Sequence, residues 1–385
     1  MKHIHTIVFA LLMCSIPTLA QEPAIRVFGY FQSSFQYKPM DNYSDASHSF
    51  NMRQMNLFMN TQIDERFSAL VNLEFLNGFS TEKGFGALNI EDAWVKYQYS
   101  PELMIKAGLL VPTFNNLSEI KNRTPLLPYI YRPLVYESTI SNILDLGNYL
   151  PERAFVQIYG TASLGEAKID YATYIGNSET SYRLKGTSGG FVSGTDTSRF
   201  KMFGGRLGVR YAGLKAGFSA TYDRNNPGDP VGVGLPVQLR DIPRVRIGLD
   251  VSYSLSGFTL ESELISVQEN LNTSNQALLD NIVLLTTNPF TGISAYGNSL
   301  NKTFYYSNLT YDVNEEWYAY GNYSYMDDKY QTFYAQGIVG YAFGGGYRPT
   351  QSVIVKVERA NYEVMNKDFF SFNQKYYTVA VSVMF

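Results

Sequence analysis

Period-two alternation of apolar and polar side chains is the feature that most constrains the fold of this chain. Within residues 243–253 one face carries Val245, Ile247, Leu249, Val251 and Tyr253, and the other carries Arg244, Arg246, Gly248, Asp250 and Ser252. Successive side chains of a β-strand point to opposite faces, so this segment is predicted to be a strand with one apolar and one polar face. The last residues, 375–385, repeat the pattern.

Sixteen segments of this kind follow one another along the chain. They cover approximately residues 25–37, 50–63, 67–76, 87–99, 103–110, 154–161, 166–175, 201–212, 215–223, 243–253, 258–267, 302–313, 316–325, 333–342, 349–359 and 375–385. After residue 20 no apolar stretch approaches the ~20 residues of a transmembrane helix. The sequence therefore predicts an all-β protein.

The connections between these segments alternate in length. The tight ones cover residues 64–66, 100–102, 162–165, 213–214, 254–257, 314–315 and 343–348. The others, mostly long, cover 38–49, 77–86, 111–153, 176–200, 224–242, 268–301, 326–332 and 360–374. Outer-membrane barrels have an even number of antiparallel strands, short periplasmic turns and long extracellular loops. The alternation predicts a 16-stranded antiparallel transmembrane β-barrel of this design.

A secreted β-sandwich would also alternate, but with its apolar face turned inward. Strands of about 10 residues match a tilted membrane crossing, whereas soluble strands average about 5–6. Aromatic side chains also stand near the strand ends on the apolar face, as in the aromatic girdles of membrane barrels. They are Tyr97, Tyr99, Tyr211, Tyr222, Tyr253, Trp317 and Tyr377. The apolar face is almost free of charge; Glu91 breaks the parity near the long-loop end of its strand.

Residues 1–20 have the three parts of a secretory signal peptide. Lys2 is followed by an apolar run from Ile7 to Ile16, and small residues precede a predicted cleavage site after Ala20. Residues 21–385 are then a single barrel domain. They contain no cysteine and one histidine, His48, which lies in a polar, loop-like stretch. We expect no metal site, no cofactor and no catalytic residues.

Composition excludes two further classes. Charged residues make up 17% of the chain, fewer than the ~25% of a typical soluble domain. A mean hydropathy of -0.16 is too polar for a helical membrane protein. The net charge of -3 gives no electrostatic reason to expect nucleic-acid binding.

The faces predicted to point inward carry many charges. Sixteen strands enclose an aqueous channel, whereas the interior of an eight-stranded barrel is filled by side chains. We expect the pore to be lined by Asp92, Trp94, Lys96, Lys106, Arg206, Arg210, Arg246, Glu261 and Glu263. Further inward charges are expected at Arg26, Glu74, Lys168, Asp170, Lys215, Asp223, Asp250, Lys356 and Glu358. Most of these charges are expected to form local ion pairs along the wall.

The longest connection, 111–153, is unusually apolar and aromatic for a surface loop. Its run from Pro125 to Tyr136 contains three prolines, which prevent it from joining the sheet as a strand. We expect this third long loop to fold inward and narrow the channel, although packing outside the barrel or across its mouth remains open. Its candidate constriction residues are Lys121, Arg123, Tyr129, Arg132 and Glu137.

One segment resembles a known family. Ile90-Glu-Asp-Ala-Trp-Val-Lys-Tyr-Gln-Tyr99, a short turn, and Leu103-Met-Ile-Lys-Ala-Gly-Leu-Leu-Val-Pro112 with Phe114 are similar to the phosphate-selective porin O and P group of bacterial outer-membrane porins. The resemblance implies a homotrimeric, 16-stranded general or anion-preferring porin with an inward third loop. Phosphate-selective members line their constriction with many Arg and Lys residues, whereas the loop here carries four charges of each sign.

The function expected from this pattern is passive diffusion of small hydrophilic solutes or ions across the bacterial outer membrane, with a weak anion preference. A plugged barrel that acts as an adhesin or structural protein is the alternative, followed by an outer-membrane lipid hydrolase that uses His48. The expected partners are outer-membrane lipid, further copies of the chain and small solutes or anions. Phe385, at the end of an alternating strand, resembles the C-terminal signal read by the barrel assembly machinery.

Overall fold

The computed structural model describes residues 24–40, 45–80, 84–117, 121–137, 150–151, 153–178, 200–225, 242–270, 299–328, 337–366 and 370–385. The predicted signal peptide lies outside the described residues. The strands are β1 (Ile25–Lys38), β2 (Ser47–Gln62), β3 (Phe67–Ser80), β4 (Gly84–Ser100), β5 (Leu103–Leu110), β6 (Ala154–Leu164), β7 (Ala167–Asn177), β8 (Lys201–Tyr211), β9 (Leu214–Asn225), β10 (Ile242–Leu255), β11 (Phe258–Asn270), β12 (Ser299–Asp312), β13 (Trp317–Asp328), β14 (Gly337–Thr350), β15 (Val353–Asn366) and β16 (Phe370–Met384). Two short 3-10 helices, η1 (Lys121–Leu126) and η2 (Leu134–Tyr136), lie between β5 and β6. In the described part of the chain, no helix is long and apolar enough to cross a membrane.

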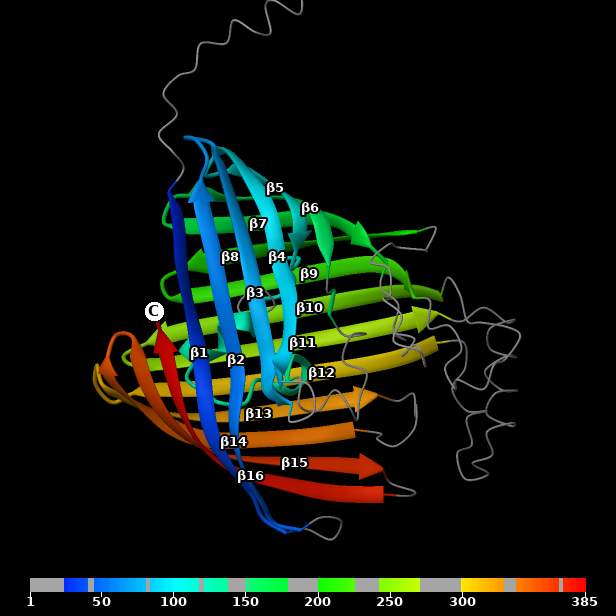
Figure 1. Ribbon diagram of the computed structural model, residues 1–385. Helices are drawn as coiled ribbons and strands as arrows, with labels where there is room; N and C mark the ends of the chain where they lie inside the picture. Colours follow the sequence, from blue (N-terminus) through cyan, green and yellow to red (C-terminus); the bar gives the residue numbers. More distant parts are fainter. Residues whose placement is uncertain are drawn as a thin grey trace, which may run out of the picture.

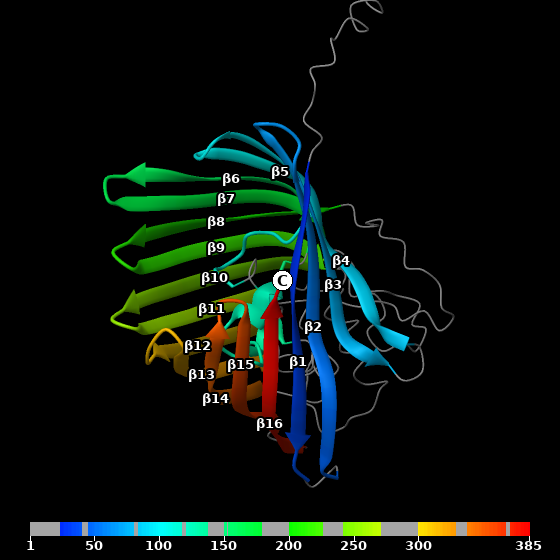
Figure 2. The same cartoon turned by 60° about the vertical axis from the view of Figure 1, so that its left-hand side comes forward.

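Each strand pairs antiparallel with its neighbours in sequence, and β1 pairs with β16, so the sheet closes into a barrel (Figures 1 and 2). Along this seam the register runs from Tyr30 opposite Met384 to Tyr37 opposite Tyr377. The backbone groups of Phe385 and Gly29 exchange two hydrogen bonds of 2.9 and 3.0 Å. Closure satisfies the backbone groups that an open sheet edge would expose. The predicted 16-stranded antiparallel barrel is confirmed.

The alternation of the sequence matches the two faces of the wall. In β10, Ile247 and Leu249 lie on the exposed outer surface, whereas Arg246 and Asp250 point inward and are buried. The predicted girdle tyrosines, such as Tyr211 and Tyr253, stand on the outer face. Apolar side chains therefore cover the outside of the barrel, and most charged groups of the strands are on the inside.

The connections also alternate, with two differences from the prediction. The turn expected at 343–348 lies within β14, and the connection between β14 and β15 is instead at 351–352. At one end of the barrel the connections cover only residues 63–66, 101–102, 165–166, 212–213, 256–257, 313–316 and 351–352. At the other end β3 and β4 pair as far as Ser80 and Gly84, and β15 and β16 pair as far as Asn366 and Phe370. The expected loops 77–86 and 360–374 are therefore mostly extensions of two hairpins. Their polar residues were poor evidence against strand structure, because a strand that leaves the apolar band no longer needs an apolar face.

β-Bulges and similar irregularities interrupt the pairing at several points, and one of them explains why Glu91 departs from the alternation. Asn72 lies opposite Asp92 and Leu73 opposite Ile90, so Glu91 is the extra residue of a bulge in β4. It is buried at this bulge, and its position near the strand end is not the reason that a charge is tolerated there. A second bulge makes Arg53 the extra residue of β2, between the partners of Gln32 and Ser33.

Candidate functional site

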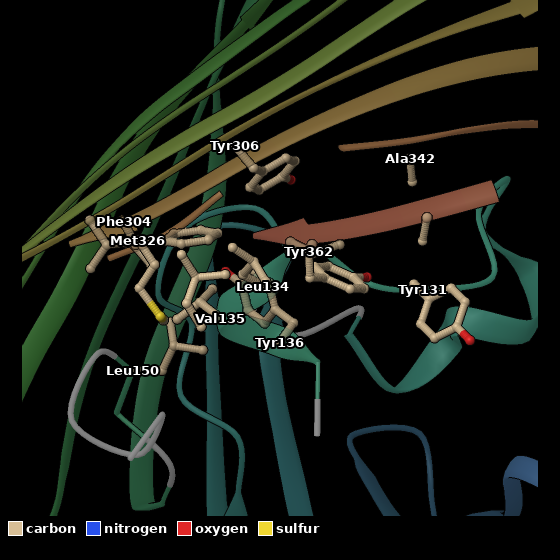
Figure 3. Close-up of a cluster of buried hydrophobic side chains, with 14 of the residues drawn as sticks. Tyr131, Leu134, Val135, Tyr136, Leu150, Phe304, Tyr306, Met326, Ala342 and Tyr362 are labelled. Atoms are coloured by element: carbon tan, nitrogen blue, oxygen red, sulfur yellow. The ribbon is translucent and has the colours of Figure 1, made fainter. Parts of the chain in front are cut away.

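The connection between β5 and β6 packs against the inner wall of the barrel. Side chains from its described segments form one apolar cluster with inward-facing side chains of β11 to β16 (Figure 3). The cluster contains Phe114, Leu117, Ile130, Tyr131, Leu134, Val135, Tyr136 and Leu150 of the connection, with Ile265, Val267, Phe304, Tyr306, Met326, Ile338, Ala342, Ala360, Tyr362 and Ala380 of the wall. An apolar patch on an inner wall would otherwise face water, so packing of the connection removes both surfaces from solvent.

Lys356 of β15 holds the η1 side of this connection. The lysine is fully buried, and its ammonium group donates hydrogen bonds to the carbonyl oxygens of Pro125 at 2.9 Å and Leu127 at 2.6 Å. Its Nζ atom also lies 3.4 Å from the Tyr129 carbonyl and 3.3 Å from Gln32 Oε1. A buried ammonium is costly unless its protons are hydrogen-bonded, and here the backbone of the connection supplies most of the acceptors.

Glu358, two residues further along β15, faces the same way and holds the next part of the connection. Its Oε2 atom accepts hydrogen bonds from the backbone N–H groups of Ile130 at 2.5 Å and Tyr131 at 3.2 Å. The hydroxyl of Tyr320 donates to the same oxygen at 2.5 Å. The strand thus presents a cation to loop carbonyls and an anion to loop N–H groups, which fixes both position and direction of the connection.

Glu263 of β11, expected to line the pore, is a third anchor. It is buried, and its Oε1 atom accepts the backbone N–H groups of Asn116 at 3.0 Å and Leu117 at 2.6 Å. Its other oxygen accepts a hydrogen bond from the hydroxyl group of Tyr136 at 2.7 Å. Burial raises the pKa of Tyr136 well above the ordinary tyrosine value, so this hydroxyl keeps the proton that it donates.

Both bulge residues also contact the connection. Arg53 forms an ion pair of 3.3 Å with Glu137, and its guanidinium carbon lies 4.0 Å from the centre of the Tyr131 ring. Glu91 lies 3.7 Å from Arg153 and accepts a hydrogen bond from it through its backbone carbonyl. The additional residue of a bulge is released from the strict alternation, so it reaches groups that a regular strand position does not.

The remaining constriction candidates divide by exposure. Tyr129 is fully buried against Tyr318 and Tyr320 of β13. Arg132 is also buried, and its backbone N–H donates to Glu137. Arg123 is exposed. Lys121 belongs to η1, but its side chain lies outside the described residues.

Two of the predicted pore arginines are in buried ion pairs. Arg206 of β8 makes a two-pronged contact with Asp250, with distances of 2.6 and 3.1 Å. A side chain at Gly217 would overlap this guanidinium, since a Cβ there would lie 2.3 Å from it. Arg246 lies 3.2 Å from Asp223, which also pairs with Arg244 at 2.6 Å.

The other predicted pore residues are less buried. Lys96 of β4 lies directly opposite Lys106 of β5 in the register, with both side chains on the inner face. The Lys106 ammonium is 4.9 Å from the ring centres of both Trp94 and Tyr159. Neither lysine forms an ion pair within the described part of the chain. Two like charges in opposite positions destabilise a sheet. The contacts that offset this cost are the two rings beside Lys106 and a hydrogen bond of 3.4 Å from Lys96 to Gln98.

The last predicted residues of the lumen have polar partners. Asp92 accepts a hydrogen bond from the backbone N–H of Val111 at 3.1 Å, where the connection between β5 and β6 begins. Arg210 pairs with Asp170 at 2.5 Å near the short-turn end and remains partly exposed. Glu261 faces inward opposite Asn308 and is half-buried.

His48 is placed differently from the expectation. It lies in β2 rather than in a loop, on the exposed outer face, with its ring 5.3 Å from that of Tyr37 and 6.5 Å from that of Phe35. No described carboxylate forms an ion pair or hydrogen bond with it. The geometry offers no support for a catalytic triad built on His48.

Sequence reasoning missed the roles of Arg53, Lys356 and Glu358. The alternation does place the last two on the inner face, but their anchoring of the connection depends on its path. The bulge that releases Arg53 has no distinctive residue to mark it.

No protein-family model matches this chain, and no curated protein matches its sequence. Several solved structures match its fold. The anion-selective porin from Comamonas acidovorans aligns over 94% of this chain and 100% of its own length, with 11% identity and a TM-score of 0.58. The outer membrane channel DcaP of Acinetobacter baumannii gives 12% identity, a TM-score of 0.59 and coverage of 94% and 97%. Salmonella typhi OmpF in complex with daunomycin gives 10% identity, a TM-score of 0.59 and coverage of 94% and 97%. The chain therefore shares the barrel fold of bacterial outer-membrane porins.

Proposed function

We propose that this protein is a porin of the bacterial outer membrane that allows passive diffusion of small hydrophilic solutes and ions. The observation that carries the proposal is that one side of the inner wall is apolar and covered by a loop, whereas the other side is charged. The connection between β5 and β6 packs on the apolar wall from β11 to β16, whereas the opposite wall presents Lys96, Lys106 and Arg210 to the lumen. A 16-stranded barrel is wide enough to leave water beside such a loop.

The loop anchors support a fixed constriction. Lys356, Glu358 and Glu263 hold the connection through seven backbone groups, and the Arg53–Glu137 pair holds its η2 end. A loop held at several points by buried charges sets a constant cross-section. In this proposal the short turns face the periplasm and the long loops face outward.

A weak anion preference follows from which charges remain unpaired. Asp170, Asp223 and Asp250 each pair with an arginine. By contrast, Lys96, Lys106 and Lys168 form no ion pair with a described residue. Glu263 and Glu358 are buried against the connection, so Glu261 and Asp92 are the partly exposed inward carboxylates that form no ion pair with a described residue. With three such lysines against two such carboxylates, the balance of accessible charge in the lumen leans positive.

The finer assignments rest on the sequence. The segment 90–112 and Phe114 support a relationship to the porin O and P group, with a homotrimeric assembly. Export after cleavage at Ala20 and recognition of Phe385 by the barrel assembly machinery complete the proposal; N-terminal sequencing of the mature protein tests the cleavage site.

Single-channel recording in a planar lipid bilayer tests the function. We expect stepwise, ohmic conductance, and in a potassium chloride gradient a reversal potential of the sign for chloride preference. Equal permeability of the two ions would reject the anion preference alone. Complete absence of current from folded protein would reject the porin and favour a plugged barrel.

A further inference from the structure

Arg359 is a charged residue on the outer face of the barrel. Its neighbours on β15, Glu358 and Ala360, are buried on the inner side, whereas Arg359 is exposed next to the exposed outer residue Val357. A lipid-facing Arg costs about 2–4 kcal/mol at the bilayer midplane and about 0–1 kcal/mol near the interface. An Arg is therefore expected here only at a boundary, or where it meets an anion.

Two aromatic residues flank the guanidinium group. Phe343 of β14 and Tyr377 of β16 are the direct register partners of Arg359. Their ring centres lie 5.5 and 5.6 Å from the guanidinium carbon, and both rings are exposed on the outer face. Contacts of this kind orient an arginine but do not neutralise its charge.

The position of Arg359 marks the end of the apolar outer face on the long-loop side. Towards the short turns, the outward residues are Val353, Val355 and Val357 on β15 and Val379, Val381 and Val383 on β16. Beyond Arg359 the next register pair of this face is Asn361, which is buried, and Lys375. Lys375 is exposed and occupies the diagonal position to Arg359 on the same face, a separation of about 7–8 Å.

Neither cation has an anionic partner among the described residues. Within the described residues no ion pair involves Arg359 or Lys375. The surface thus combines two cations in diagonal register positions, a tyrosine hydroxyl and a row of valines that extends towards the short turns. The parallel N–H groups of an arginine guanidinium can donate to two oxygens of one phosphate, and lipid acyl chains require an apolar surface.

We propose that Arg359 and Lys375 bind the phosphate of an anionic membrane lipid in the leaflet at the long-loop end, with its acyl chains along the valines of β15 and β16. The site rests on the proposed function only in that the barrel spans a membrane; it does not require the lumen to conduct. The occupant is a lipid rather than a free anion because the cations stand at the edge of the apolar face.

Native mass spectrometry of the detergent-purified full-length barrel tests the site. The probes are phosphatidic acid, phosphatidylcholine as the lipid without net charge, and inorganic phosphate. The test variant is Arg359→Gln/Lys375→Gln. The matched control, Lys96→Gln/Lys106→Gln, removes two cations from the inner face instead. We expect wild type and control to retain phosphatidic acid in preference to phosphatidylcholine, and the test variant to lose roughly tenfold or more in affinity.

Several outcomes would overturn the proposal. Unchanged phosphatidic acid binding by the test variant, or no preference over phosphatidylcholine in wild type, would remove the site. Displacement of the lipid by equimolar inorganic phosphate would assign it to free anions. Loss of assembly with unchanged lipid binding would assign the surface to contact between copies of the chain. The heat-dependent migration of the test variant on a denaturing gel shows that its barrel is folded whether or not the lumen conducts, which keeps this result separate from the porin proposal.

Discussion

Arg53 and Glu137 are 84 positions apart in the chain, yet they form a buried ion pair of 3.3 Å between the barrel wall and the connection between β5 and β6. Arg53 reaches this position because it is the extra residue of a bulge in β2. Its guanidinium group also covers the ring of Tyr131. One irregularity in the wall therefore contacts the loop at two points.

Replacement Arg53→Gln should loosen this end of the connection. Removal of one partner from a buried pair costs about 3–5 kcal/mol because the other charge is left without compensation. We expect a lower unfolding temperature and noisier single-channel current. Arg66→Gln, in the exposed turn between β2 and β3, is the control and should change neither quantity. An unaltered current in Arg53→Gln would show that the pair does not hold the loop.

Replacement Lys356→Met should increase the size of solute that passes. The variant keeps much of the side-chain volume but leaves the carbonyl groups of Pro125 and Leu127 without their donor. Buried carbonyls without a donor cost about 1–3 kcal/mol each, so this part of the connection should leave the wall. Liposome swelling with sugars of increasing size measures the cutoff.

Lys168→Met is the control for that experiment, since its ammonium group forms no ion pair with a described residue. It should retain the wild-type cutoff. If Lys356→Met does so as well while its barrel is folded, Lys356 does not position the constriction.

Replacement Asp250→Asn should increase the preference for anions. Arg206 would lose the carboxylate with which it makes its two-pronged contact, and one net positive charge would be added to the lumen. The reversal potential in a salt gradient should move towards the chloride equilibrium potential. The double variant Arg206→Gln/Asp250→Asn restores the charge balance and should return the potential to its original value; a double variant as anion-selective as the single one would contradict the argument.

The double replacement Lys96→Gln/Lys106→Gln should reduce or abolish the anion preference. These lysines occupy opposite register positions and have no described carboxylate partner, so mobile anions are their natural counterions. Asp92→Asn, on the same strand as Lys96, is the matched variant of opposite sign and should shift the reversal potential the other way. Identical shifts in both variants would indicate a general disturbance of the wall.

Much of the barrel was predictable because lipid and water impose opposite demands on alternate residues. Ile247 and Arg246 are neighbours in sequence with opposite environments, and that contrast is visible without a structure. Closure followed from the number of strands and the alternating connections. The hairpin ends at Ser80 and Asn366 were not predictable, since the apolar constraint ends where the strands leave the membrane.

The arrangement of charges inside the lumen was harder to predict. Alternation placed Arg206 and Glu263 on the inner face, but it could not show that one pairs with Asp250 and the other holds the backbone of the connection. Those contacts depend on register between strands and on the path of a loop with no period. A bulge adds one residue to a strand and reverses the face to which the following side chains point, so the alternation could not place Arg53 and Glu91 correctly.

The seam between β1 and β16 provides the last prediction. At Gly29 an added Cβ would lie 2.4 Å from the Asn56 carbonyl oxygen and 2.9 Å from the ring of Phe385. Gly29→Val should therefore push β1 away from the Asn56 carbonyl of β2 and displace the Phe385 ring at the seam, and it should lower the temperature at which the folded form is lost on a denaturing gel. Gly321→Val in β13 is the matched control, because a Cβ there meets nothing within 4 Å. Equal heat resistance of the two variants would show that the seam at Phe385 tolerates a side chain and that closure does not depend on this contact.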